Sequence, residues 1–425
     1  MTSRKVASPS REDSFSRPDW LLEFNRSGRG LSQDTRGLIP LEMESLLEAA
    51  SAGTGLTDFG PSDFREPLDV LLQSLDQEAA LSPMGRILAR GDILNLLENR
   101  LFLTEAHRSH PEMHSQAIEK PLFIVGLPRS GTSILHELLS QDPRLRAPLS
   151  WEVHSPWPPP GAEPETEAGR IQRAEEVFTF WNELVPEYRT MHEMGARIPC
   201  ECIWLTAHSF RSEEFLGRNP VPSYGGWLAT ADLAPAYRIH RQLLELLQWK
   251  QETPRWLLKA PSHMVALGSL FAEYPDARII QTHRDPLQIM GSSVNILKAL
   301  WWMRSEEVDP ALIQASFAGE GLAARLFAAL DFRDQGTTDP DQFQDVRFSD
   351  LMEDPITTLE AVYEWLEMEF PPAVERAMLD YLEAKPRGKH GKHEYTFSEL
   401  GLDLGTERDR FIGYQERFNV PSEVV

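Results

Sequence analysis

The stretch Phe123–Leu139, FIVGLPRSGTSILHELL, is the part of the sequence that best indicates the fold of this chain. It includes most of an apolar run, Leu122–Val125, that is short and apolar enough for a buried parallel strand. A turn with Gly126 and Gly131 follows, and apolar residues then recur three and four positions apart, as in an amphipathic helix. A strand, a glycine loop and a helix in this order aim backbone N–H groups at an anion. The alternative is a plain strand-to-helix turn that contains two glycines.

The loop differs from the phosphate-binding loop of nucleoside triphosphatases at a decisive position. Gly126 and Gly131 keep the spacing of G-x-x-x-x-G-K-[ST], but Thr132 stands where the lysine would reach the outer phosphates. Arg129 is the only cation of the loop sequence. Such a loop still cradles a phosphate-like group, but it is not set up for metal-assisted transfer of a terminal phosphate. The pattern G-x-P-R-S-G-T-[ST] resembles the 5′-phosphosulfate loop of sulfotransferases, which use 3′-phosphoadenosine-5′-phosphosulfate (PAPS).

Composition limits the partners that we expect. The chain has 425 residues, 41% of them hydrophobic, which is enough for one large domain or two ordinary ones. Its formal net charge of −23 argues against nonspecific binding to nucleic acid or to an anionic membrane. No apolar run approaches the length of a transmembrane helix. Cys200 and Cys202 are too close in sequence for an easy disulfide and lack a second metal-binding pair, so we expect a reduced, cytoplasmic protein.

Patterns along the chain predict several regions. Residues 1–37 have no apolar signal-peptide core and are predicted to be a disordered lead-in. Residues 38–118 carry helical patterns and predict a helical N-terminal region packed on the core, which begins near residue 119. A helical insertion at about 160–250 is rich in aromatic residues. It is either a lid over an acceptor pocket or a helical subdomain whose aromatic side chains are only core.

Further strands alternate with helices and indicate a doubly wound parallel sheet. We expect extended segments at Leu145–Leu149, Arg255–Leu258, Ala277–Thr282 and Asp345–Phe348. Polar clusters follow several of these segments, and ligands of such sheets bind at the carboxyl ends of the strands.

A second anion site is predicted from Arg284 and Ser292. Arg284 follows a predicted strand, and Ser292 lies eight residues later in the next helix. An arginine beside a helix start and a hydroxyl within the helix can hold a phosphate together. Alone, the pair is more often a surface salt bridge and a cap. With the loop, it resembles the R-x7-S element that holds the 3′-phosphate of PAPS in sulfotransferases.

Four further motifs resemble the bacterial sulfotransferase family that is related to the tyrosylprotein enzymes. They are Trp151-Glu152, Trp256–His263 (WLLKAPSH), Thr282–Pro286 (THRDP) and Arg410–Phe418 (RFIGYQERF). The resemblance covers the chain from about Pro121 to the C-terminus and implies a P-loop-like three-layer α/β domain over 119–425.

The resemblance also implies the residues that hold PAPS. The 5′-phosphosulfate would be held by the loop residues Arg129, Ser130, Gly131, Thr132 and Ser133, and the 3′-phosphate by Arg284 and Ser292. The basic run at 387–393, RGKHGKH, is either a flexible cap over the nucleotide or a solvated loop.

Sulfuryl transfer to a hydroxyl needs an in-line acceptor, a base for its proton and cations where charge develops on the departing phosphate. Lys259, which matches the catalytic lysine of the tyrosylprotein enzymes, would face the bridging oxygen, with help from Arg129. Three side chains compete to be the base. Glu152 ranks first, because it matches the glutamate base of the tyrosylprotein branch, His263 second and His136 third. No metal is needed.

The predicted function is transfer of the sulfuryl group of PAPS to a hydroxyl or amine of a small-molecule or lipid-like acceptor. The alternatives are a P-loop kinase of small molecules and a catalytically silent nucleotide-binding protein. The absent loop lysine weighs against the kinase. Lys259, Glu152 and both anion sites weigh against the silent protein.

Overall fold

The computed structural model describes residues 17–31, 35–156, 167–190, 193–251, 254–316, 319–385 and 397–424. Its strands form one parallel sheet in the order β2-β3-β1-β4-β5. The strands are β1 (Leu122–Gly126), β2 (Leu145–Arg146), β3 (Arg255–Lys259), β4 (Arg278–His283) and β5 (Phe343–Arg347). The predicted parallel α/β fold is therefore confirmed.

The sequence of the central strand β1 suits its position. All five of its residues are buried, and a strand that is covered on both faces needs apolar residues throughout. The edge strand β2 is shorter than the predicted segment Leu145–Leu149. Leu149 instead forms an isolated antiparallel bridge with Pro199, and α6 (Ser150–His154) begins at the next residue. Pro148 lies between β2 and that bridge and has no N–H to donate to a ladder.

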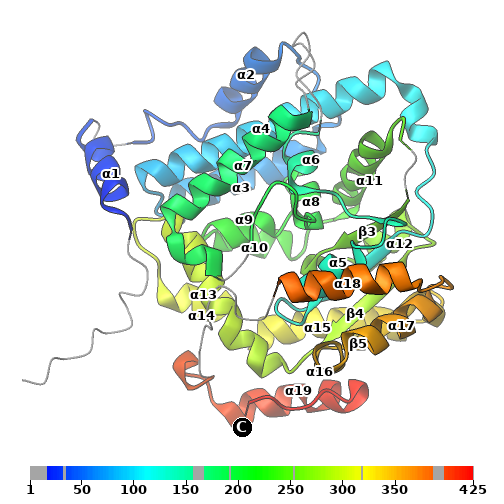
Figure 1. The fold of residues 1–425 in the computed structure, drawn as a ribbon. Coiled ribbons are helices and arrows are strands. Elements are labelled where there is room, and N and C mark those ends of the chain that lie inside the picture. The colour runs from blue at the N-terminus through cyan, green and yellow to red at the C-terminus, as the bar shows by residue number, and fades with distance from the viewer. Residues whose placement is uncertain are drawn as a thin grey trace, which may run out of the picture.

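Helices cover both faces of the sheet, which gives the three layers (Figure 1). Leu122 and Ile124 of β1 point to one face, and Phe123 and Val125 point to the other. The first face is covered by α5 (Thr132–Leu139), α16 (Phe348–Glu353), α17 (Pro355–Trp365) and α18 (Pro372–Ala384). The second is covered by α11 (Ala234–Gln248), α12 (Leu267–Glu273), α15 (Gly319–Asp334) and α19 (Leu404–Phe418).

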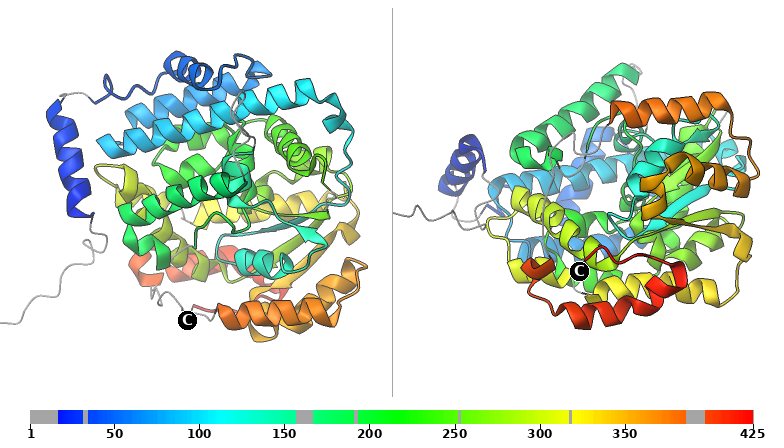
Figure 2. Two further views of the ribbon diagram at one scale, coloured as in Figure 1. Left: turned by 45° about the horizontal axis from the view of Figure 1, so that its top comes forward. Right: turned by 60° about the horizontal axis from the view of Figure 1, so that its bottom comes forward.

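The predicted helical N-terminal region consists of α1 (Asp19–Leu31), α2 (Met43–Thr54), α3 (Arg65–Gln77) and α4 (Pro83–Ser109). The prediction of a disordered lead-in over 1–37 is wrong for α1, which stands at the edge of the molecule in Figure 2. Leu21 is fully buried, and Asn25 accepts a hydrogen bond of 3.0 Å from the Met84 N–H on α4. This docking on α4 offsets the entropy of ordering the segment.

The predicted insertion at about 160–250 is helical where the structure describes it. It contains α7 (Glu167–Leu184), α8 (Cys202–Ala207), α9 (Glu214–Arg218), α10 (Pro222–Leu228) and α11. Phe210 and Tyr224 are fully buried in one cluster with residues of α2, α3 and α4. These aromatic side chains are core, which favours the interpretation as a helical subdomain over an aromatic-lined lid.

Helices α13 (Pro286–Arg304) and α14 (Pro310–Ser316) follow β4. The short 3-10 helices are η2 (Ser62–Phe64), η3 (Pro111–Ser115), η4 (Pro186–Thr190), η5 (Pro261–Val265), η6 (Pro340–Gln342) and η7 (Phe397–Leu400). Across the described ranges, no helix combines the length and the apolar character that crossing a membrane requires.

Candidate active site

The glycine loop joins the carboxyl end of β1 to the first turn of α5. Gly126 has a φ of 151° and pairs with Thr282 on β4. A Cβ at Gly126 would lie 2.1 Å from Thr282 Oγ1, so the close approach of the loop to β4 requires glycine. Gly131, with a φ of 94°, occupies the N-cap position of α5. The loop therefore directs the first turn of α5, where backbone N–H groups have no partner within the helix, toward the end of the sheet.

Ser130 lies with the other predicted loop residues, but its polar groups are turned inward. Its hydroxyl donates to the Leu127 carbonyl at 2.6 Å and lies 2.6 Å from Thr282 Oγ1. Its N–H also donates to Leu127, at 3.2 Å. Ser130 therefore fastens the loop to β4. Thr282, which the sequence analysis left without a role, is its partner there.

Lys259 ends β3 beside β1, and its side chain is only 3% exposed. Its ammonium donates to Ser133 Oγ at 3.2 Å and forms an ion pair with Glu201. Lys259 and the last hydroxyl of the loop thus lie together. Glu201 is a residue that the sequence analysis missed. It precedes α8 and lies between the two cysteines, and no recognised motif marks it.

Glu152 lies in the first turn of α6, and its carboxylate is held locally. Oε1 accepts a hydrogen bond from Arg146 at 2.8 Å, and Oε2 accepts one from the Leu149 N–H at 2.9 Å. The side chain also lines a cavity of about 550 Å³ that Lys259 does not reach. Among the described residues, Glu201 is the carboxylate that contacts Lys259, and Glu152 is not brought to it.

The two candidate histidines lie within the apolar layers, each 1% exposed. His263 Nδ1 lies 2.6 Å from the Tyr237 hydroxyl, and its ring packs edge-on against Phe123. Burial lowers the pKa of His263 well below its usual value. Burial, together with the charge of Lys259, lowers the pKa of His136 to about 3. Neither ring is open to an incoming molecule.

Arg284 lies beside the loop at the end of β4. One guanidinium N–H donates to the Arg129 carbonyl at 2.8 Å. The Nε–H and the other terminal N–H donate to the Glu423 carboxylate at 2.8 and 2.7 Å. The backbone of Ser292 lies in α13, but its side chain and the basic run at 387–393 lie outside the described residues. The structure thus places Arg284 next to the loop, while the other half of the predicted pair is not described.

Known proteins share this architecture. A solved sulfotransferase, STF1 from Mycobacterium tuberculosis H37Rv, is 32% identical, with a TM-score of 0.75 over 88% of this chain and 98% of its own. STF9 from Mycobacterium avium is 25% identical, with a TM-score of 0.79 over 91% of this chain and 98% of its own.

Curated relatives are the omega-hydroxy-beta-dihydromenaquinone-9 sulfotransferases Stf3 of Mycobacterium bovis and Mycobacterium tuberculosis. Each is 27% identical in an alignment of 271 positions that covers 58% of this chain. The chain spans 63% of the length of these curated relatives. The model of the sulfotransferase family matches residues 121–372, more than half of the chain and the whole of the described loop and sheet. The chain therefore belongs to the sulfotransferase family.

Proposed function

We propose that this protein transfers the sulfuryl group of PAPS to a hydroxyl of a hydrophobic acceptor. The observation that carries the proposal is the position of Lys259, which contacts the last hydroxyl of the anion loop and a carboxylate at once. A cation beside the loop can stabilise the negative charge of the departing phosphate. A carboxylate beside that cation can accept the proton of the acceptor.

In the proposed reaction, the acceptor oxygen bonds to sulfur as the bond between sulfur and the bridging phosphate oxygen breaks. The acceptor proton passes to the Glu201 carboxylate, and the charge that develops on the bridging oxygen is stabilised by Lys259. We favour Glu201 over Glu152 as the base because Glu201 touches the lysine that faces the leaving group. Its side chain is 20% exposed, so an acceptor can approach it.

The predicted loop residues Arg129, Gly131, Thr132 and Ser133 would hold the 5′-phosphosulfate, with Ser130 keeping the loop in shape. Arg284 and Ser292 would hold the 3′-phosphate. The contact between Arg284 and the Arg129 carbonyl supports one continuous donor site, since it joins the two predicted anion sites.

The name of Stf3 gives a hydroxylated menaquinone as the acceptor of that relative. This supports a lipid-like alcohol as the acceptor here. Radiolabelled PAPS offered with a hydroxylated isoprenoid quinone, a simple phenol and an amine would test the acceptor class. We expect label on the quinone, and no label when Lys259→Met replaces the wild type. Lys250→Met, which removes an exposed lysine, is the matched control.

Donor identity is tested separately by thermal unfolding. The product 3′-phosphoadenosine-5′-phosphate (PAP) should raise the melting temperature by mass action, and ATP with Mg²⁺ should raise it much less. Equal stabilisation by both nucleotides would instead support a P-loop kinase.

A further inference from the structure

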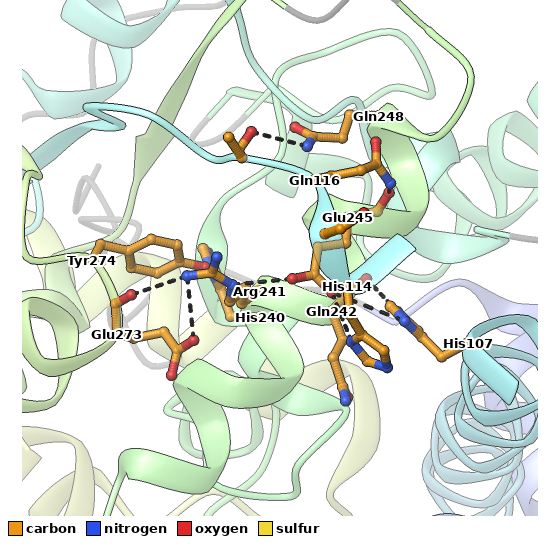
Figure 3. Close-up of polar contacts among 12 residues, drawn as sticks. His107, His114, Gln116, His240, Arg241, Gln242, Glu245, Gln248, Glu273 and Tyr274 are labelled. Carbon is orange, nitrogen blue, oxygen red and sulfur yellow. Dashed lines mark hydrogen bonds and ion pairs between the residues drawn. The ribbon is translucent and has the colours of Figure 1, made fainter. Parts of the chain in front are cut away.

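His107, His114 and Glu245 form a second polar cluster, which contains no residue of the glycine loop (Figure 3). His107 lies in the last turn of α4, His114 in η3 and Glu245 in α11. The chain runs from η3 into the start of β1, and from α11 toward the start of β3. The cluster therefore lies near the amino ends of these strands, whereas the loop and Lys259 lie at their carboxyl ends.

The ligand atoms of the three side chains lie close together. Glu245 Oε2 lies 3.4 Å from His114 Nδ1 and 3.9 Å from His107 Nδ1. The three ligand atoms all lie within 4.8 Å of one another. The two imidazole rings are stacked, with their centroids 4.4 Å apart. Both distances to the carboxylate exceed the 2.7–2.9 Å that is typical of a charge-assisted hydrogen bond.

Two of these atoms are buried and make only long ion-pair contacts within the cluster. The side chains of His107 and Glu245 are 6% and 3% exposed. Neither His107 Nδ1 nor Glu245 Oε2 has a hydrogen-bond partner. A buried acceptor left without a hydrogen bond is destabilising, and more so when it is charged, so native proteins rarely leave two such atoms close together.

Neighbouring groups hold His107 and Glu245 in place within the cluster. His107 Nε2 lies 3.1 Å from the Gln242 carbonyl, which can only accept, so this nitrogen carries the proton and Nδ1 of the neutral ring presents its lone pair. Arg241 donates to the other carboxylate oxygen of Glu245 at 3.0 Å. Arg241 is itself held by the Glu273 carbonyl at 3.2 Å. Such partners are what fix metal ligands in place.

We propose that His107, His114 and Glu245 bind a divalent transition-metal ion, zinc by preference. Two imidazole nitrogens and one carboxylate oxygen are a ligand set that zinc takes in proteins. Ligands at about 2.0–2.1 Å from a tetrahedral ion lie about 3.3 Å apart, close to the spacing of His114 and Glu245. The side chain of His114 is 53% exposed, so it can move and water can take the fourth position.

The ion would act as a structural clamp, outside the sulfuryl transfer. It would join the end of α4 and η3, from the N-terminal helical region, to α11, which packs on the sheet. A hydrogen bond of 2.8 Å from the Gln116 side chain to the Glu245 carbonyl already ties the same segments together. The expectation that the reaction needs no metal is unaffected by this site.

The test uses the full chain after removal of metal with a chelator. Zinc is titrated in competition with a chelating dye, and cobalt is added as a spectroscopic probe. We expect one zinc per chain, a higher melting temperature with zinc, and the visible absorption of a tetrahedral cobalt site. His114→Ala, at a half-exposed position, should keep the fold and weaken zinc binding at least tenfold, and Glu245→Gln should do the same.

Two controls decide whether the cluster is the site. His110→Ala removes a neighbouring histidine outside the cluster and should leave zinc affinity unchanged. His390→Ala with His393→Ala removes the histidines of the basic run and should also retain binding. The proposal is overturned if the wild type binds no zinc, if His114→Ala binds as tightly as the wild type, or if only the basic-run variant loses binding.

Discussion

The ion pair of Lys259 and Glu201 concentrates the proposed chemistry in two side chains. A lysine that is 3% exposed would be strongly destabilising without a countercharge, and Glu201 supplies that charge. Because the same lysine donates to Ser133 at the end of the loop, the carboxylate is fixed relative to the predicted donor site. One contact can therefore both stabilise the buried charge and place a proton acceptor.

Replacement of Glu201 by glutamine tests this role. Glu201→Gln keeps the shape and removes the proton acceptor, so turnover should fall about a hundredfold or more while the dissociation constant of PAP stays nearly unchanged. The variant should also be less stable than the wild type, because Lys259 loses its countercharge. Glu152→Gln is the matched comparison, because its carboxylate is engaged by Arg146 and should matter less for turnover. Steady-state rates with calorimetric binding of PAP separate the two effects. Near-normal turnover in Glu201→Gln, together with an inactive Glu152→Gln, would return the base to Glu152.

The loop depends on glycine at position 126 for steric reasons. In Gly126→Ala, the new methyl would lie 2.1 Å from Thr282 Oγ1 and 2.9 Å from Ser130 Oγ, at a φ of 151°. We expect a loss of more than about 1 kcal/mol of unfolding free energy and much weaker PAP binding. Gly91→Ala is the control, since nothing lies within 4 Å of its Cβ in the helix α4, and it should stabilise slightly. Urea unfolding of both variants measures the difference, and equal stabilities would contradict the steric argument.

At the scale of elements, the segment after α19 closes over the end of β4. Glu423 forms a two-point contact with the Arg284 guanidinium, and its N–H donates to Asp285 Oδ2 at 2.7 Å. A phosphate would use the same planar fork of donors as this carboxylate does. In the proposed donor site, the C-terminal segment would therefore compete with the 3′-phosphate for Arg284.

We expect replacement of Arg284 and replacement of Glu423 to change the affinity for PAP in opposite directions. Arg284→Ala should weaken PAP binding by on the order of 1.5–3 kcal/mol, because it removes a charge-assisted phosphate contact. Glu423→Gln should tighten binding, because it removes the competing charge. Glu416→Gln, at an exposed position of α19, controls for the general change in net charge. Calorimetric titration with PAP gives all three values, and tighter binding in Glu416→Gln alone would remove Glu423 from the site.

Local patterns were enough for the sheet and the loop, and not for the whole site. The residues before Gly126 are all apolar, which suits a strand that is buried on both faces, so composition alone predicts that they lie in the centre of the sheet. Glu201 lies 58 positions from Lys259, and only the packing of α8 brings the two together. The sequence around Phe210 does not distinguish a side chain that lines a pocket from one that lies in the core. The helices that bury Phe210 come from the N-terminal region. Long-range packing of this kind leaves no local periodicity to read.

At the scale of the whole molecule, buried histidines set the response to acid. His136, His208, His240 and His263 are at most 1% exposed. Burial lowers the pKa of His136 and His240 to about 3 and that of His208 to about 4, and it lowers the pKa of His263 well below its usual value. Hydrogen bonds also orient one of these rings: His208 Nδ1 lies 3.0 Å from the Trp204 carbonyl, and Nε2 lies 3.2 Å from the Asn99 amide. These partners suit only a neutral ring.

Acid should therefore destabilise the protein well above the range in which carboxylates titrate. Below about pH 6.5 the unfolded chain takes up protons on these histidines while the folded chain does not, so the free energy of unfolding falls as pH falls. The loss approaches about 1.4 kcal/mol per pH unit for each histidine and ends near the lowered pKa values. Urea unfolding at about pH 7.5, 6.5 and 5.5 measures the slope. The pKa values of His107, His154 and His283 are lowered as well, so His240→Gln should reduce the slope by only roughly a seventh. His110→Ala, at a partly exposed position, should leave it nearly unchanged. A flat profile from pH 7.5 to 5.5 would show that these rings are protonated in the folded protein.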